Sequence, residues 1–284
     1  MDKKISIFEV GPRDGLQNIK NEIPINRKIE IIDILSTTGI KKIECGSFVS
    51  AKWVPQMRGT DQIFQEILRK DGVKYTALTP NLKGFENAMS VKVDEIAVFA
   101  AASETFSQKN VNCSIAESLE RFEDIFKKAK QTKIPVRGYV SCIVECPYEG
   151  TVKPEKVLEV TSRLLEMGCY EVSLGDTIGK GTPKTVDALL KVICENLHAQ
   201  QLAGHFHDTS DTAIKNVEIA LKYGITTFDT AIGGLGGCPY APGAKGNLST
   251  VQLINAIGIN SFIGALDLEK LLYAEKYLTS MLKN

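Results

Sequence analysis

The sequence predicts an α/β protein built on one (β/α)8 barrel, or TIM barrel, with extra helices after it. The chain has 284 residues with 43% hydrophobic content, which is enough to bury one large core. Barrels of roughly 250 residues commonly form a single domain. Short runs rich in β-branched residues alternate with longer amphipathic runs, a pattern typical of a parallel sheet with helical crossovers. No linker-like, highly charged or low-complexity stretch interrupts this alternation, so we expect one domain over 1–284.

Eight strand-like runs make up the predicted barrel. They are Ile5–Val10, Lys42–Cys45, Lys74–Leu78, Glu95–Phe99, Val136–Val140, Glu171–Leu174, Leu202–His207 and Thr227–Thr230. Helical patterns between them include Asn26–Thr37, Asp61–Arg69, Ile115–Gln131, Pro154–Met167, Pro183–Asn196 and Thr212–Tyr223. Gly39, Gly168 and Gly224 follow such patterns closely, where a left-handed cap favours glycine. Further helices are expected after about residue 247.

The net charge and the lengths of the apolar runs indicate which kinds of molecule the protein can bind. The formal net charge is zero, so no cationic field attracts nucleic acid or an anionic membrane surface. No apolar run approaches the roughly 20 residues that span a bilayer, and a strand-like run begins too early for a signal peptide. We therefore expect a cytoplasmic protein that binds a small molecule, with no nucleic-acid or membrane partner.

The seven cysteines are an odd number scattered over a large chain, unlike the dense, even sets of small secreted scaffolds. We expect them to be reduced, and most of them to be small buried hydrophobic residues. Cys238 differs, because it lies in a glycine-rich segment at 233–247 that is neither helical nor strand-like. We interpret this segment as a loop over the mouth of the barrel, where a thiol is exposed enough to react.

Polar residues follow the predicted strands at one end, which is where a parallel barrel places its functional side chains. Buried without partners, such groups would each cost a few kcal/mol, on the order of 2–7, so a shared site explains them best. The candidates are Arg13, Asp14 and Gln17 after strand 1, Glu44 in strand 2, Asp176 after strand 6, His205 and His207 in strand 7, and Cys238 after strand 8.

Two of these residues indicate a metal site. His205 and His207 are two positions apart on a strand and project from the same face, as neutral imidazole ligands for a divalent metal would. Asp14 adds a carboxylate across the mouth, and Asn247 offers an amide oxygen at the base of the glycine-rich segment. This ligand set leaves coordination positions open for substrate and water. Each residue also has a structural alternative: an H-x-H pair suits a core, and an aspartate after a strand often caps a helix.

Three charged residues could support chemistry beside the metal. Arg13 keeps its charge at working pH and could face a developing enolate oxygen. Glu44 and Asp176 could orient the ligands, and either could equally be a structural partner of Arg13. The glycine-rich segment lacks the Lys-Ser/Thr ending of a phosphate-binding loop.

These residues and their order resemble the 3-hydroxy-3-methylglutaryl-CoA lyases. Those lyases belong to a metal-dependent barrel family that also contains isopropylmalate and homocitrate synthases. The resemblance covers nearly the whole chain. The motifs that carry it include FEVGPRDGLQN near the start, IECGSFVSAKWVPQM at 43–57, SLGDTIGKGTP at 173–183, HFHDT at 205–209 and GGLGGCPYAPGAKGN at 233–247. The synthases generally lack the cysteine segment.

The resemblance implies a homodimer that cleaves an acyl-CoA thioester, 3-hydroxy-3-methylglutaryl-CoA, to acetyl-CoA and acetoacetate. It also implies a bound Mg²⁺ or Mn²⁺ ion. The implied metal ligands are Asp14, His205, His207 and Asn247. The implied catalytic residues are Arg13 at the thioester carbonyl and enolate, Cys238 in proton transfer to the enolate, Asp176 or His205 at the tertiary hydroxyl, and Glu44 in support. Gln17 and Ser47 are expected to contact substrate together with Arg13.

Four positions depart from the family pattern, all after the ends of strands 5 to 8. They are Glu145, Lys180, the pair Ser210-Asp211, and Val251 where a glutamate is usual. None removes a predicted metal ligand. The loss of a glutamate at Val251 leaves open a lyase for a bulkier 3-hydroxy-3-alkylglutaryl-CoA. A barrel that binds metal and acyl-CoA without catalysis is the remaining alternative, although the retained Arg13, Asp14, both histidines and Cys238 argue against it.

Overall fold

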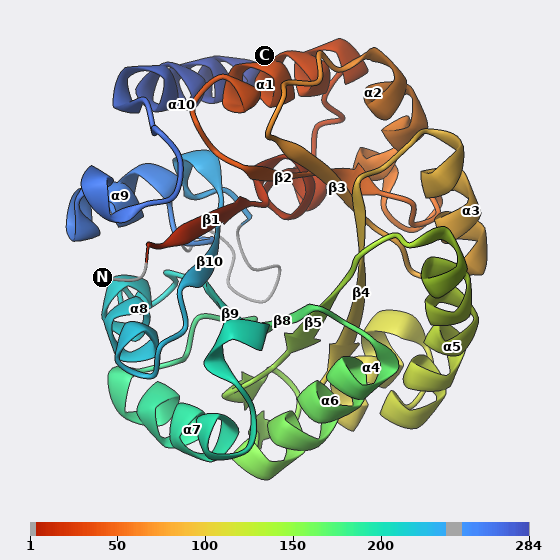
Figure 1. Cartoon of the computed structure of the whole chain (residues 1–284), viewed down its shortest axis with the longest axis vertical. Helices are drawn as coiled ribbons and strands as arrows, with labels where there is room; N and C mark the ends of the chain where they lie inside the picture. The colour runs from red at the N-terminus through yellow and green to blue at the C-terminus, as the bar shows by residue number, and fades with distance from the viewer. Residues whose placement is uncertain (1–3, 237–245, 284) are drawn as a thin grey trace.

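A closed barrel of eight parallel strands surrounded by helices forms the protein (Figure 1). The computed structural model describes residues 4–236 and 246–283. Around the barrel the order is β1, β2, β3, β4, β5, β8, β9 and β10, which closes on β1. The barrel strands are β1 (Ser6–Glu9), β2 (Lys42–Ser47), β3 (Lys74–Leu78), β4 (Glu95–Ala101), β5 (Val136–Ser141), β8 (Glu171–Asp176), β9 (Leu202–Phe206) and β10 (Thr227–Thr230). All eight predicted strands are confirmed, with ends shifted by at most two residues.

Helices cover the outside of the barrel and continue after it. They are α1 (Ile25–Ser36), α2 (Thr60–Glu66), α3 (Leu82–Ser90), α4 (Glu104–Val111), α5 (Ile115–Thr132), α6 (Pro154–Met167), α7 (Pro183–Asn196), α8 (Ala213–Lys222), α9 (Thr250–Ile257) and α10 (Leu268–Lys283). The last two are the predicted extra helices, and α10 lies beside α1 (Figure 1). Short helical turns are η1 (Gly11–Gly15), η2 (Pro55–Met57), η3 (Ala199–Gln201), η4 (Ile232–Gly234) and η5 (Ile259–Ser261). A small antiparallel pair, β6 (Glu145–Cys146) with β7 (Gly150–Thr151), follows β5.

Local sequence signals set the helix ends. Ser114 begins α5 with a capping box, in which its side chain and that of Glu117 each accept a backbone N–H of the other residue. Pro154 and Pro183 occupy the first turns of α6 and α7, where the missing N–H costs nothing. Gly168 ends α6 at a φ of 118°, a left-handed conformation that suits glycine. Of the described residues, none belongs to a helix long and apolar enough to span a membrane.

The barrel interior contains a buried ion network as well as apolar side chains. Arg137 on β5 is 1% exposed and binds Asp229 on β10 through two hydrogen bonds of 2.7 and 3.2 Å. Its Nε also donates to Glu171 on β8 at 2.8 Å, and the guanidinium lies 4.0 Å from the ring centroid of Phe8. Because β5 and β10 are not neighbours, these contacts cross the barrel. Removing one partner of such a network leaves a buried charge and typically costs about 3–5 kcal/mol.

Candidate metal and active site

The predicted site residues gather at the carboxyl ends of β1, β2 and β9, joined there by Asn247. Immediately after β1, the carbonyl oxygen of Val10 accepts the backbone N–H groups of Arg13, Asp14 and Gly15 at 2.7–3.2 Å. This tight turn, η1, therefore holds Arg13 and Asp14 directly at the end of β1. A side chain at Gly15 would meet the Cβ of Leu235 at 2.9 Å, so close packing against the chain after β10 requires glycine there.

Arg13 is 6% exposed and binds two carboxylates at the mouth of the barrel. Its Nε donates to Glu44 and its Nη1 to Asp14, both at 2.6 Å. Burial lowers the pKa of Arg13, but the two carboxylates outweigh burial and hold that pKa above its ordinary value. Tyr139 lies below, with its ring 5.3 Å from the guanidinium and its hydroxyl donating to Glu44 at 3.2 Å. The guanidinium is therefore permanently charged and held in one orientation.

Asp14, His205 and His207 form a compact ligand group. One ligand atom from each lies within 4.8 Å of the others, and the Nε2 atoms of the two histidines are 3.2 Å apart. Asn247 joins them, because it pairs with His207 in a short β-bridge and donates from Nδ2 to Asp14 at 2.8 Å. All four predicted metal ligands thus lie together, on the end of β9, on η1 and on the chain that returns before α9.

The hydrogen bonds of this group leave acceptor atoms on His205 and Asn247 that could bind a cation. Nδ1 of His205 lies 3.1 Å from a carboxylate oxygen of Asp229, which only accepts, so Nδ1 carries the proton and Nε2 presents a lone pair. The Asn247 amide nitrogen donates to oxygens of Asp14 and Leu235, and its buried Oδ1 has no hydrogen-bond partner among residues 4–236 and 246–283. An unsatisfied buried polar atom costs about 1–3 kcal/mol. Two imidazole nitrogens, a carboxylate and an amide oxygen suit a first-row divalent cation or Mg²⁺, so the residues present fit the metal.

Electrostatics keep two of these ligands, Asp14 and His207, in their metal-binding forms, whereas Asp229 and Asp14 outweigh burial and raise the pKa of His205. Burial raises the pKa of Asp14, but Arg13 and the two histidines outweigh burial and lower that pKa to about 2. Burial, aided by the nearby His205, lowers the pKa of His207 to about 4. Near neutral pH Asp14 is therefore ionised and His207 is neutral, which are the forms that coordinate metal.

Sequence reasoning missed Asp229, which orients His205 from inside the barrel. Besides His205 and Arg137, it accepts the hydroxyl of Ser173 at 2.7 Å. Burial raises the pKa of Asp229, yet Arg137 outweighs burial and holds that pKa well below its ordinary range. The available signal was a charged residue inside a predicted barrel strand, Thr227–Thr230, because such a carboxylate needs partners when buried.

The other predicted residues lie outside this ligand group or outside the described residues. The two oxygens of Asp176 accept the N–H groups of Lys180 and Gly181 at 3.1 and 2.8 Å. Burial raises the pKa of Asp176 to about 6 against these hydrogen bonds. Ser47 is buried at the end of β2, and its hydroxyl accepts the N–H of Val49 at 3.2 Å.

The remaining positions singled out in the sequence are Gln17, Cys238 and Val251. Gln17 is half-buried just after η1. Cys238, with most of the glycine-rich segment, falls among residues 237–245, outside the described part of the chain. Val251, where the family pattern has a glutamate, is buried in the first turn of α9, so this helix presents an apolar side chain to the core there.

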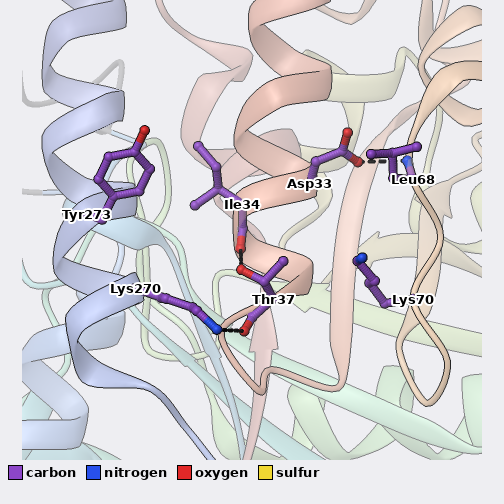
Figure 2. A pocket seen from close by; sticks show the side chains of 7 residues that line it. All are labelled: Asp33, Ile34, Thr37, Leu68, Lys70, Lys270 and Tyr273. Atoms are coloured by element: carbon purple, nitrogen blue, oxygen red, sulfur yellow. Dashed lines mark hydrogen bonds between the residues drawn. The ribbon is translucent and has the colours of Figure 1, made fainter.

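A separate hollow lies on the outer wall of the barrel, between α1, α10 and the chain after α2 (Figure 2). Asp33 accepts the N–H of Leu68 on one side, and Lys270 donates to the carbonyl of Thr37 on the other. None of the predicted site residues lines this hollow. The chemistry predicted from the sequence therefore belongs to the barrel mouth.

Comparison with known proteins gives consistent matches. The family model described as HMGL-like matches residues 4–278. Over 264 residues the chain is 51% identical to a protein of Pseudomonas aeruginosa named 3-hydroxy-3-isohexenylglutaryl-CoA/hydroxy-methylglutaryl-CoA lyase, covering 92% of this chain and 88% of that one.

Solved structures agree with this match. The crystal structure of the HMG-CoA lyase from Brucella melitensis has a TM-score of 0.97 and 47% identity, covering 99% of this chain and 100% of that one. A further HMG-CoA lyase, from Acinetobacter baumannii, was solved in complex with coenzyme A and 3-methylmalate. It has a TM-score of 0.92 and 34% identity, covering 99% of this chain and 92% of that one.

Proposed function

This chain belongs to the HMGL-like family, and from that premise we propose that it is a divalent-metal-dependent lyase that cleaves 3-hydroxy-3-methylglutaryl-CoA to acetyl-CoA and acetoacetate. The ligand atoms of Asp14, His205 and His207, within 4.8 Å of one another beside the charged Arg13, support this proposal most directly. Hydroxymethylglutaryl-CoA lyases at 47–51% identity support the substrate.

The four predicted ligands would hold the cation. Asp14, His205, His207 and the Oδ1 of Asn247 would bind it. When bound, the cation acts as a Lewis acid that polarises the oxygens of the hydroxy-acyl group and holds that group in place. The Asp229 carboxylate keeps His205 in the tautomer that presents Nε2.

Arg13 stabilises the charge that develops when the carbon–carbon bond breaks. The electron pair of that bond moves onto the acetyl-CoA fragment, and an enolate oxygen develops at the thioester. A guanidinium held by Glu44 and Asp14 at 2.6 Å needs little reorganisation to meet this charge. Gln17 and Ser47, near the ends of β1 and β2, are proposed to contact the substrate.

Two proton transfers complete the reaction. We assign removal of the tertiary hydroxyl proton to Asp176 rather than to His205, since Nδ1 of His205 already donates to Asp229 and its Nε2 faces the cation site. A pKa of about 6 leaves Asp176 largely ionised at neutral pH, yet basic enough to accept a proton. Cys238 then donates a proton to the enolate carbon, which gives acetyl-CoA, while the hydroxyl carbon becomes the ketone of acetoacetate.

One experiment tests the function. Metal-free protein is incubated with Mg²⁺ or Mn²⁺ and a panel of 3-hydroxy-3-alkylglutaryl-CoA thioesters, while acetyl-CoA release is followed. We expect turnover of the methyl compound that stops with excess chelator and returns with metal. Preference for a longer alkyl group would identify the bulkier substrate instead. No acetyl-CoA release from any thioester, with metal and acyl-CoA bound, would identify a non-catalytic barrel.

From the resemblance we also propose that the cation is Mg²⁺ or Mn²⁺ and that the protein is a homodimer, and from the sequence composition that it is cytoplasmic. Mn²⁺ and Mg²⁺ titrations, sedimentation at micromolar concentration and cell fractionation test them in turn.

A further inference from the structure

Glu9, the last residue of β1, is a buried carboxylate that the reaction described above does not use. It is fully buried, and its hydrogen bonds come from neutral donors on three separate segments. Oε1 accepts the backbone N–H of Gly11 at 2.9 Å and that of Ile232 at 2.8 Å, and Oε2 accepts the hydroxyl of Thr250 at 2.6 Å.

These donors stand at the starts of the segments that carry the site. Gly11 begins η1, which holds Arg13 and Asp14. Ile232 begins η4, whose continuation through Leu235 accepts both the backbone N–H and the side-chain amide of Asn247, at 3.1 and 2.9 Å. The one carboxylate therefore joins the turn before the metal ligands to the segment that supports Asn247.

The third contact fixes the far side of the same segment. Thr250 begins α9, three residues after Asn247, and its hydroxyl also lies 2.8 Å from that of Thr230 at the end of β10. Packing around Glu9 is tight as well. A Cβ at Gly11 would fall 2.5 Å from Glu9 Oε1 and 3.2 Å from the nitrogen of Ile232. The backbone at Gly11 can thus approach the carboxylate only because it has no side chain.

We propose that Glu9 is a positioning residue for the lyase reaction, which fixes the Arg13–Asp14 turn and the Asn247 segment relative to each other. The inference rests on the proposed function for its effect on turnover, but its effect on metal binding can be measured without turnover. Burial raises the pKa of Glu9 to about 7, although its three donors oppose the rise. A buried carboxylate of this kind lowers the stability of the fold, and an apolar side chain could fill the same space without that cost.

The chain offers a matched control in Glu95, at the start of β4. It is also buried, and its carboxylate accepts from Lys42 at 3.2 Å and from Tyr170 at 2.7 Å. These residues open strands β4 and β2 and precede β8, so they lie at the end of the barrel opposite to the site. A Glu→Met substitution keeps the side-chain volume but removes the hydrogen-bond acceptor. The same substitution can therefore be compared at the site end of the barrel, at Glu9, and at the opposite end, at Glu95.

The experiment compares Glu9→Gln, Glu9→Met and Glu95→Met by circular dichroism, Mn²⁺ titration and steady-state kinetics with 3-hydroxy-3-methylglutaryl-CoA. The Gln oxygen keeps both backbone N–H contacts, so Glu9→Gln should stay within about 3-fold of wild type in kcat and in Mn²⁺ affinity. Glu9→Met fills the space without an acceptor. A misplacement of about 1 Å can cost roughly 10²-fold in rate, so its kcat should fall about 10- to 100-fold, with Mn²⁺ affinity about 10-fold weaker. Glu95→Met should lose thermal stability only.

Several outcomes overturn the proposal. One is a folded Glu9→Met protein with wild-type kcat and Mn²⁺ affinity, and another is a Glu9→Gln protein as impaired as Glu9→Met. If Glu9→Met does not fold, Gly11→Ala replaces it, since the added methyl must displace the Glu9 carboxylate. Wild-type Mn²⁺ affinity in folded Gly11→Ala then refutes the positioning role. If the wild type binds Mn²⁺ but turns over no thioester, the proposed function fails, while the Mn²⁺ comparison still decides on Glu9.

Discussion

Replacing Asp229 with asparagine should weaken metal binding from inside the barrel, although Asp229 is not itself a predicted metal ligand. The carboxylate accepts from Arg137, Ser173 and His205, and an amide of the same shape can accept with only one of its two ends. If the amide nitrogen faces His205, Nδ1 can no longer donate to it, and the tautomer that presents Nε2 loses its support. If the amide nitrogen instead faces Nη2 of Arg137, Glu171 is the one carboxylate that still binds the buried guanidinium among the contacts of Arg137 described above.

The magnitudes follow from these contacts. Loss of a carboxylate that orients a metal-binding histidine typically costs 10- to 100-fold in metal affinity, or about 1.4–2.7 kcal/mol. Breaking a buried ion pair costs about 3–5 kcal/mol of stability. At about 2–4 °C per kcal/mol for a domain of nearly this size, Tm should fall by roughly 6–20 °C.

Mn²⁺ titration and thermal unfolding of Asp229→Asn test this expectation, with Glu171→Gln as the control. Glu171 binds the same arginine at 2.8 Å and lies four residues before Gly175, the residue of β8 that pairs with His205. The control should therefore lose stability while its Mn²⁺ affinity stays within about 2-fold of wild type, well below the 10-fold expected for an orienting carboxylate. Asp229→Ala removes the acceptor for Nδ1 of His205 in any orientation, so it should lose Mn²⁺ affinity whichever way the asparagine amide turns. Unchanged Mn²⁺ affinity in both folded variants would show that His205 does not depend on Asp229, and the tautomer assignment would be wrong.

Further changes test other parts of the site. His207→Ala should lose Mn²⁺ affinity and turnover together with the fold kept, whereas the exposed His198→Ala should match wild type in titration and kinetics. Cys238→Ser should lower kcat by roughly 10²- to 10⁴-fold with normal Mn²⁺ stoichiometry, because a hydroxyl is a much weaker acid than a thiol, while Cys169→Ser should keep kcat. The pKa of Glu9 is raised to about 7 from 4.5, so the native state binds its proton more tightly than the unfolded chain. Stability should then fall by about 3 kcal/mol as pH rises from 4.5 to 7, and Glu9→Gln should raise Tm at pH 8 but not at pH 5.

Each expectation has a result that contradicts it. Unchanged Mn²⁺ binding in His207→Ala would make that histidine a core residue. Wild-type kcat in Cys238→Ser with metal bound would move proton delivery to another group or to solvent. The same Tm difference between Glu9→Gln and wild type at pH 5 and pH 8 would mean that Glu9 titrates near its ordinary value.

Periodicity and strand-end chemistry made the fold and part of the site predictable. The β-branched runs and their spacing predicted all eight barrel strands, because burial on both faces requires nearly continuous apolar sequence. The parallel arrangement then brought the ends of β1, β2 and β9 to one mouth, and so Arg13, Glu44 and His205 could be expected together. The identity of the substrate came from resemblance to a family, since strand-end residues indicate chemistry more readily than they indicate an acyl group.

Side chains that support the site from within the barrel could not be found in this way. Alternation along a strand tells which residues point inward, but the barrel register decides which inward residues lie at the same height. Asp229 meets Arg137 and His205 only because β10, β5 and β9 close into a ring with a particular stagger. Glu9 likewise looks like any polar residue at a strand end until folding brings the backbone of Ile232, 223 positions away, to within 2.8 Å of its carboxylate. The sequence by itself determined which residue types stand at the barrel mouth, whereas only the tertiary structure decided which buried carboxylates hold them there, because those contacts join segments far apart in the chain.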